Sequence, residues 1–245
     1  MKTEIIILSK NIQLLTQCIE SINPSRYKNL TITVGDTGLE NRDSLIKYDI
    51  NFVKIKKYKF STNNNVLAKK SKADFLIFMN DDIIMMPKWD VISKMQEHFK
   101  NNFKTLGTIG TRLFFANQKV QHGGIIFINT GSKIVPTHAE LNQNKFHNEN
   151  IEVMGNTGAF LGINKKVFDD IGGFDETYNE CYEDIVLNLE CKKLNLKNIF
   201  LGNMCGAYHL DGTTRNMNVE TDLLIEQDRV KFQKWYIENF NKFMK

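Results

Sequence analysis

The sequence predicts an α/β fold in which helices cover both faces of a mostly parallel central sheet. Apolar, β-branched runs alternate with helical patterns along the first 80 residues, an order typical of parallel sheets. The run Phe75-Leu76-Ile77-Phe78-Met79 is continuously apolar, as in a strand buried on both faces. A length of 245 residues fits one large domain. We therefore expect ligands to bind at the carboxyl ends of the strands.

The elements of the first half follow one another as such a sheet requires. A β-branched, apolar run predicts a strand over 3–9, and apolar residues at helical spacing predict a helix over 11–22. Asn23-Pro24 ends that helix, because proline cannot continue it. The same reasoning predicts further strands over 30–34, 52–55 and 74–79, and a helix over 63–71.

The second half is less regular. Polar residues without periodicity predict a loop over 131–149, placed above the site. The small residues of 158–162 predict a segment whose backbone can approach a ligand closely. Other expected elements are strands over 108–115, 123–128, 198–201 and 206–209, and helices over 167–171, 183–194 and 219–240. Because no repeat or linker interrupts the chain, we expect one domain over 1–218 and an amphipathic C-terminal helix over 219–245, packed on the domain or on a partner.

Composition excludes several classes of protein. With 42% hydrophobic and 24% charged residues the chain is neither collagen-like, disordered nor a coiled coil. A net charge of +4 is too small to indicate a nucleic-acid partner. No apolar run approaches the roughly 20 residues of a membrane span, and residues 5–8 are too few for a signal-peptide core. The four cysteines form no Cys-x-x-Cys pair, which is typical of reduced thiols. We therefore expect a cytoplasmic protein.

Two adjacent carboxylates, Asp81 and Asp82, follow the buried strand after Asn80. Because they repel each other, a cation or a cationic ligand is a reason to keep both at the end of a strand. A turn, or a helix cap before Pro87, accounts for the same residue types. The residues alone leave both interpretations open.

A second acidic pair, Glu183-Asp184, opens a predicted helix. The helix dipole favours acidic residues in the first turn of any helix, so the pair alone does not indicate catalysis. The turn at Gly172-Gly173 and the small residues of 158–162 precede it. These neighbours allow a backbone to approach a ligand and favour a site at this point.

His209 ends a predicted strand, and Thr213, Thr214 and Arg215 follow it. A single histidine is more often a hydrogen-bonded structural residue than a metal ligand. Imidazole nevertheless ligates divalent ions, and guanidinium pairs with phosphate oxygens. The segment therefore has the chemistry to hold a metal and a diphosphate together.

In their order, these segments resemble the inverting family 2 glycosyltransferases, which have the GT-A nucleotide-diphospho-sugar transferase fold, and most closely their bacterial rhamnosyltransferase-like branch. The resemblance covers about Glu4 to Arg215. The segments that carry it include Ile6-Ile7-Leu8-Ser9-Lys10-Asn11, Val34-Gly35-Asp36-Thr37-Gly38, Phe60-Ser61-Thr62-Asn63-Asn64-Asn65, Asn80-Asp81-Asp82, Val120-Gln121-His122-Gly123-Gly124, Glu183-Asp184 and residues 209–215. Their order is more specific than any one of them.

The resemblance implies catalytic and metal-binding roles. Asp184 would be the catalytic base, with Glu183 beside it on the acceptor side. Asp82 and His209 would ligate Mn²⁺ or Mg²⁺. This agrees with the chemistry of sugar transfer, because the leaving diphosphate must be neutralised and the acceptor hydroxyl must lose its proton.

The resemblance also implies a set of residues that bind the nucleotide sugar. These are Ser9, Asp36, Asn65, Asp81 and Arg215. Asp36 would recognise the base or ribose, and Asp81 would lie near the ribose or the sugar. Three positions depart from the family pattern: Asn80 replaces an aspartate found in many members, Leu67 a usual glycine, and Gly212 a serine.

We therefore expect a metal-dependent inverting glycosyltransferase that moves a sugar from a nucleoside-diphosphate sugar to a hydroxyl of a glycan or lipid-linked glycan, in surface polysaccharide synthesis. A nucleotide-sugar-binding module without turnover is one alternative, suggested by Asn80. A sugar-phosphate nucleotidyltransferase is another, although Ser9-Lys10-Asn11 is not the Gly-rich triphosphate loop that this class needs. The aromatic face of the C-terminal helix leaves two further partners open, a second subunit in a homodimer or the inner face of the membrane.

Overall fold

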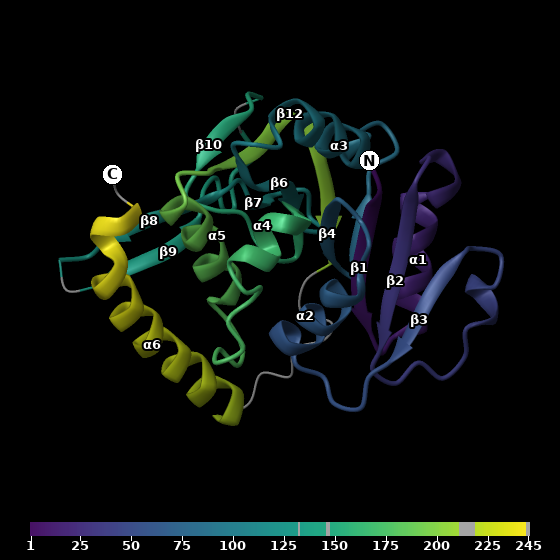
Figure 1. Ribbon diagram of the computed structural model, residues 1–245, viewed down its shortest axis with the longest axis horizontal. Coiled ribbons are helices and arrows are strands. Elements are labelled where there is room, and N and C mark those ends of the chain that lie inside the picture. The colour runs from purple at the N-terminus through teal and green to yellow at the C-terminus, as the bar shows by residue number, and fades with distance from the viewer. Residues whose placement is uncertain (132, 146–147, 211–218, 244–245) are drawn as a thin grey trace.

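A mixed sheet with helices on both faces forms the centre of the protein (Figure 1). The computed structural model describes residues 1–131, 133–145, 148–210 and 219–243. The strands are β1 Thr3–Ser9, β2 Leu30–Asp36, β3 Ile50–Lys54, β4 Phe75–Asn80, β5 Ile83–Met85, β6 Leu106–Phe114, β7 Val120–His122, β8 Ile125–Asn129, β9 Ile134–His138, β10 Ile151–Val153, β11 Phe160–Asn164 and β12 Lys197–His209. The helices are α1 Ile12–Ile22, α2 Phe60–Lys70, α3 Val91–Asn102, α4 Lys165–Asp170, α5 Glu183–Lys193 and α6 Val219–Phe243.

The strand order places the predicted parallel strands side by side. Across the main sheet the order is β10-β12-β6-β11-β4-β1-β2-β3, with β5 paired to β12 and β7 to β6. Strands β4, β1, β2 and β3 are mutually parallel, and β12 is parallel to β6. Strand β11 lies antiparallel between β4 and β6. The predicted α/β fold is confirmed, and its parallel strands end at a common edge.

Alternate side chains of β1 separate the two apolar layers. Ile5 and Ile7 pack with α1 and α3 on one face, whereas Ile6 and Leu8 pack with α2, α4 and α5 on the other. Successive residues of a strand point to opposite faces, so a continuously apolar strand is needed where both faces are covered. Strand β4 behaves in the same way, since Ile77 faces the first layer and its neighbours the second.

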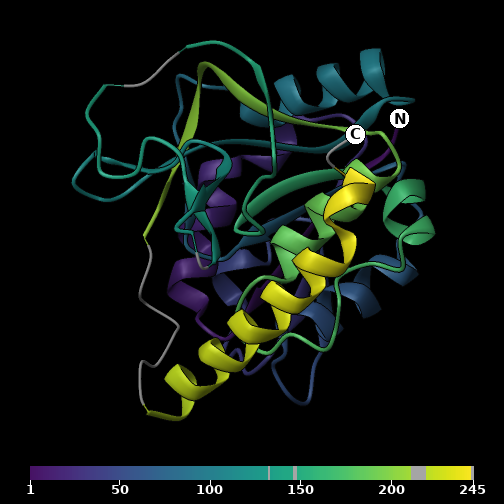
Figure 2. The same cartoon turned by 90° about the vertical axis from the view of Figure 1, so that its left-hand side faces the viewer.

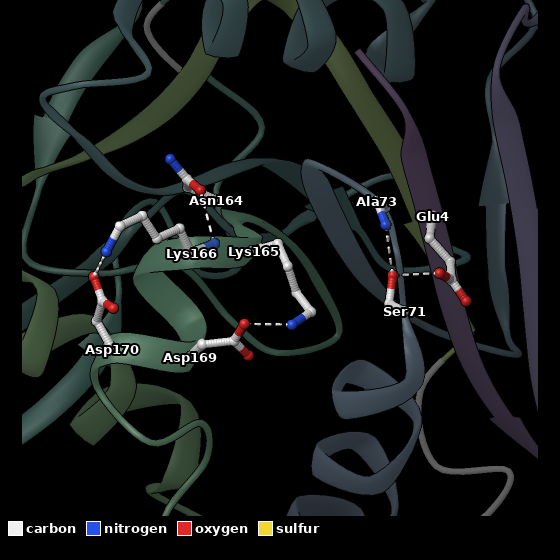
Figure 3. Close-up of polar contacts among 8 residues, drawn as sticks. All are labelled: Glu4, Ser71, Ala73, Asn164, Lys165, Lys166, Asp169 and Asp170. Carbon is white, nitrogen blue, oxygen red and sulfur yellow. Dashed lines mark hydrogen bonds and ion pairs between the residues drawn. The ribbon is translucent and has the colours of Figure 1, made fainter.

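Helix α4 is short, and local contacts support it (Figure 3). Asn164 caps it by accepting a hydrogen bond of 2.9 Å from the backbone N–H of Lys166. Lys166 pairs with Asp170 at 2.6 Å, and Lys165 pairs with Asp169. Pairs at this spacing each stabilise a helix by roughly 0.2–0.5 kcal/mol. The cap and the pairs fix the beginning and the outer face of the helix.

A second polar cluster in Figure 3 fixes the chain between α2 and β4. The Ser71 hydroxyl donates to the buried carboxylate of Glu4 on β1 and accepts from the Ala73 N–H at 3.1 Å. Thr33 of β2 also donates to Glu4. The carboxylate therefore ties the end of α2 to the first two strands.

One expectation about the second half was wrong, and one strand was not expected. The sequence predicted no strand within 158–162, but β11 begins at Phe160 and runs through the middle of the sheet. Gly162 is required there for packing, since a Cβ at this position would lie 2.5 Å from the Phe75 ring and 2.8 Å from Ile109. The expected loop 131–149 contains β9, which pairs with β8 in a separate two-stranded hairpin.

Other differences concern the extent of elements. The strands expected at 198–201 and 206–209 form the single strand β12, whose register with β6 shifts between Leu201 and Gly206. Helix α3 was not expected, although Val91, Ile92, Met95 and Phe99 lie buried at helical spacing. Helix α2 begins at Phe60, three residues before the expected start.

Helix α6 runs along one side of the molecule, beside α5 and the β8–β9 hairpin (Figures 1 and 2). Phe232 and Tyr236 are buried in an apolar cluster with Val186 and Leu189 of α5, and Phe127 of β8 packs against this cluster. Aromatic contacts connect the same elements, since the Phe127 ring lies 5.4 Å from that of Tyr236. No helix in the described part of the chain is long and apolar enough to span a bilayer.

Candidate active site

A cavity of about 880 Å³ opens at the carboxyl ends of β1 and β4, where the sequence predicted a site. It collects side chains from segments along the whole chain, from Leu8 to Thr221. Those that bear on chemistry are Asn80, Asp81, Asp82, Gln121, His122, His138, Glu183, Asp184 and His209. The predicted site residues Asp81, Asp82, Asp184 and His209 therefore share one cavity with Glu183.

Asp82 and His209 lie together although 127 positions separate them. Strand β5, which follows Asp82 directly, pairs antiparallel with the end of β12, so that Ile83 lies opposite His209. The Leu210 N–H also donates to the Asp82 carbonyl at 3.1 Å. As a result, Asp82 Oδ1 lies 3.2 Å from His209 Nε2, with both residues buried.

The other nitrogen of His209 sets the orientation of its ring. Nδ1 lies 2.8 Å from Gln121 Oε1, an oxygen that only accepts, so Nδ1 carries the proton. In the neutral ring Nε2 is then the acceptor, and the Asn80 side-chain amide lies 3.2 Å from it. A neutral imidazole held by a second residue through its Nδ1 proton is the form in which histidine ligates metals.

A carboxylate and an imidazole acceptor that face each other at hydrogen-bond distance fit a shared cation. Oxygen and nitrogen donors together suit Mn²⁺ or Mg²⁺. Within the described residues no group of three or more His, Cys, Asp or Glu side chains could hold a metal. The pair Asp82–His209 would therefore leave most coordination positions to a ligand and to water.

Asp81 points to the N-terminal strand rather than to His209. The Ser9 hydroxyl donates to its Oδ2 at 2.6 Å. Burial raises the pKa of Asp81 to about 6, with the negative charge of Asp82 acting in the same direction and the Ser9 hydrogen bond against it. The structure thus brings together Ser9 and Asp81, two of the residues predicted to bind the donor.

Asp184 is held at the start of α5. Its Oδ2 accepts from the Gly158 N–H at 2.7 Å, and its Oδ1 from the Ile185 N–H at 2.7 Å. Burial raises the pKa of Asp184, whereas these N–H groups and the nearby His138 lower it. Gly158 lets the two segments approach closely, because a Cβ there would lie 3.2 Å from that of Asp184, tighter than most such contacts.

Two histidines lie beside Asp184 on the cavity wall. Their Nδ1 atoms are 2.8 Å apart, so one of His122 and His138 must donate a proton to the other. Burial lowers the pKa of His122 well below its ordinary value. A neutral pair can donate and accept hydrogen bonds without adding charge.

Three of the predicted donor-binding residues do not line the cavity themselves: Ser9, which is bonded to Asp81, and Asp36 and Asn65. Asp36 is buried at the end of β2, where its carboxylate accepts from the N–H groups of Gly38 and Leu39 and pairs with Arg42. Burial opposes ionisation of Asp36, but these donors hold its pKa below the ordinary value. Asn65 is bonded to Phe174 and Glu176. Both residues stabilise the backbone around the site.

Arg215 lies outside the described residues, as does the Gly212 position. The structure also shows cavity residues that the sequence left without a role. Gln121 and His122 belonged to a segment that carried the resemblance, whereas His138 fell in the expected loop. The signal for His138 was weak, because β9 holds a proline and polar residues instead of an apolar run.

The family model for glycosyl transferase family 2 matches residues 4–172. This chain belongs to that family. The match covers most of the sheet and the Asn80-Asp81-Asp82 segment. The rhamnosyltransferase-like branch stays a prediction.

Two curated relatives are much longer than this chain. O-antigen biosynthesis protein RfbC of Myxococcus xanthus is 26% identical over 156 residues, which cover 57% of this chain and 11% of the relative. Uncharacterized protein y4gI of Sinorhizobium fredii is 24% identical over 226 residues, which cover 84% of this chain and 24% of the relative. This chain therefore spans about a tenth of the length of RfbC and about a quarter of that of y4gI.

Solved structures of glycosyltransferases share the fold. GalNAc-T7 with UDP, GalNAc and Mn²⁺ superimposes with a TM-score of 0.65 at 15% identity, over 89% of this chain and 45% of that one. The mannosyltransferase PcManGT from Pyrobaculum calidifontis, in complex with GDP-Man and Mn²⁺, superimposes with a TM-score of 0.60 at 8% identity, over 87% of this chain and 58% of that one. S. aureus TarS 1-349 superimposes with a TM-score of 0.58 at 12% identity, over 85% of this chain and 60% of that one. The predicted GT-A fold of this family 2 glycosyltransferase is confirmed.

Proposed function

We propose that this family 2 glycosyltransferase moves a sugar from a nucleoside-diphosphate sugar to a hydroxyl of a glycan or lipid-linked glycan, with inversion at the anomeric carbon. The observation that carries the proposal is the single cavity with an Asp82–His209 pair and a separately held Asp184. Such a reaction needs a cation for the leaving diphosphate and a base for the acceptor.

The donor side of the proposal rests on the two carboxylates after β4. Asp82 and His209 would hold the divalent ion, Mn²⁺ or Mg²⁺, with Gln121 fixing the His209 ring. Once bound, such an ion would neutralise charge on the diphosphate. Asp81 would contact the ribose or sugar, with its position set by the Ser9 hydroxyl. Structural neighbours that hold UDP or GDP-Man with Mn²⁺ support this assignment.

The acceptor side rests on Asp184. The acceptor oxygen would attack the anomeric carbon while the bond from that carbon to the diphosphate oxygen breaks, and the hydroxyl proton would pass to Asp184. Burial raises the pKa of this carboxylate, which makes it a stronger base than an exposed aspartate. The Gly158 N–H keeps the carboxylate in place, and Glu183 would orient the acceptor. The leaving nucleoside diphosphate carries away the electron pair.

We further propose a role in surface polysaccharide synthesis at the inner face of the membrane. The relative RfbC, an O-antigen biosynthesis protein, supports such an acceptor. Residues 1–218 would form the transferase domain. The helix over 219–245 would be an extension, with a membrane surface or a second subunit as a further contact.

The metal assignment can be tested by removing its two ligands. Asp82→Ala and His209→Ala should each lower transfer by at least about 100-fold, and the double variant should be little worse than the worse single variant, because both act through one ion. The readouts are transfer rate and Mn²⁺ affinity by calorimetry. Asp49→Asn, which changes an exposed aspartate, is the control.

A panel of nucleotide sugars measured with Mn²⁺ by thermal unfolding would identify the donor. A ligand at 100 times its dissociation constant adds about 2.7 kcal/mol of stability.

For the metal test, losses that add fully in the Asp82→Ala/His209→Ala double variant, or transfer that persists in chelator, would contradict the shared ion. Donor binding and transfer together would also exclude a binding module without turnover.

A further inference from the structure

A buried carboxylate on α6 contacts the loop that leads to Asp184. Asp228 has no exposed surface. Its Oδ2 accepts from three consecutive backbone N–H groups, those of Asn179 at 2.8 Å, Glu180 at 2.7 Å and Cys181 at 3.3 Å. Its Oδ1 lies 3.3 Å from the Asn179 side-chain amide. One side chain of the C-terminal helix therefore binds three successive peptide groups of the cavity wall.

The residue after this loop is held in an unusual conformation. Tyr182 has φ 75° and ψ −10°, in the left-handed region that a bulky side chain rarely adopts. Such a conformation persists only where its surroundings determine it. Here α6 supplies a second contact, because the Phe232 ring stacks on that of Tyr182 with centroids 4.9 Å apart and planes 13° apart.

The loop determines where the acidic pair of α5 lies. Tyr182 is the N-cap of α5, and Glu183 and Asp184 form its first turn. All residues from Asn179 to Asp184 line the cavity, together with Thr221 from the first turn of α6. A change of conformation at Tyr182 would move the start of α5 and thereby the carboxylate of Asp184 away from Gly158.

We propose that α6 is a positioning element of the active site, in which Asp228 and Phe232 hold residues 179–182 so that Asp184 meets the acceptor. This proposal rests on the proposed role of Asp184 as base. Asp228 does not touch the reacting atoms and acts through the loop.

A purely packing role explains Phe232 but not Asp228. A helix that only covers α5 needs apolar side chains, and a buried carboxylate costs free energy unless hydrogen bonds compensate it. Asp228 has these bonds, and all those that the described residues show come from one loop. The carboxylate is therefore hydrogen-bonded only when residues 179–181 have this conformation. Its role is to select that conformation of the loop.

The test compares Asp228→Asn with Asp184→Asn and with Asp222→Asn, which changes an exposed aspartate on the same helix. Asn keeps the size of Asp228 but has one oxygen acceptor and no charge. Transfer is measured at temperatures where each variant is fully folded, and kcat, acceptor KM and donor affinity are determined separately. We expect Asp228→Asn to lower kcat at least tenfold with donor affinity unchanged within twofold, and Asp222→Asn to match the wild type.

The outcomes separate the two proposals. If Asp184→Asn loses turnover and folded Asp228→Asn keeps a wild-type kcat, positioning by α6 is overturned and the base assignment stands. If Asp184→Asn itself keeps its turnover, both are overturned. Should Asp228→Asn not fold, Phe232→Leu replaces it, because leucine keeps an apolar contact but removes the ring stacking on Tyr182; a kcat unchanged in this variant also overturns the proposal.

Discussion

At the scale of single residues, the site depends on which atom of each polar group is already used. Gln121 Oε1 accepts a hydrogen bond from Nδ1 of His209, and the Gly158 N–H donates to one oxygen of Asp184. These contacts leave Nε2 of His209 facing Asp82. The sequence indicated His209, Asp82 and Asp184 by residue type and order, but it did not show these contacts, because each joins residues far apart in the chain.

For Asp36 and Asn65 the donor-binding role stays a prediction. Asp36 contacts the backbone of Gly38 and Leu39 and the Arg42 side chain, and Asn65 contacts Phe174 and Glu176. A carboxylate or amide at the end of a strand can bind a ligand or complete a turn, and the residue type is the same in both cases. Only the partner atoms distinguish the two roles.

Asn80 offers a prediction at this scale. Its amide lies 3.2 Å from His209 Nε2, next to the proposed ion and without contact to Asp184 in the described hydrogen bonds. Asn80→Asp keeps the size of the side chain and introduces a carboxylate, which can share the proposed ion. Transfer should therefore stay within about tenfold of the wild type, a change of ~1.4 kcal/mol in the barrier. The measurement is the initial transfer rate of Asn80→Asp at saturating Mn²⁺. A fall in this rate by several orders of magnitude would show that the neutral amide is required.

At the scale of elements, long-range pairing decides what the local pattern cannot. Strand β1 and helix α1 were predicted because their apolar periodicity is strong and each packs on its neighbour in sequence. Strands β5 and β11 were not, since β5 has three residues and β11 contains a glycine that weakens a strand. Their pairing partners lie far along the chain, and the pairing of β5 with β12 brings Asp82 to His209.

Gly162 provides the prediction for β11. Alanine at this position would place its Cβ against the Phe75 ring and Ile109 in the middle of the sheet, so we expect a loss of stability of about 1–3 kcal/mol. Chemical denaturation measures the difference. Gly131→Ala is the control, because that glycine has no neighbour within 4 Å of the added carbon and only its φ of 84° disfavours alanine. Equal stability of Gly162→Ala and the wild type would contradict the packing role of this glycine.

At the scale of the whole molecule, the candidate active site is assembled from both halves of the chain. The parallel half supplies Asp81 and Asp82, with Ser9 bonded to Asp81, and the irregular half supplies Asp184 and His209. The sequence predicted the first half in order because regular periodicity marks it. Strand β9 of the hairpin was not predicted, because it contains polar residues and a proline, and β12 was predicted as two strands, because a register shift interrupts its pattern.

The central claim, that Asp184 is the base of an inverting transfer in this cavity, has one direct test. The measurement is the transfer rate of Asp184→Asn at saturating donor, acceptor and Mn²⁺, alongside its donor affinity by calorimetry. Asparagine keeps the shape of the side chain but cannot take the acceptor proton, so we predict a rate lower by roughly 10²- to 10⁴-fold with donor affinity unchanged. A rate near that of the wild type, or a loss of donor binding together with turnover, would contradict the claim.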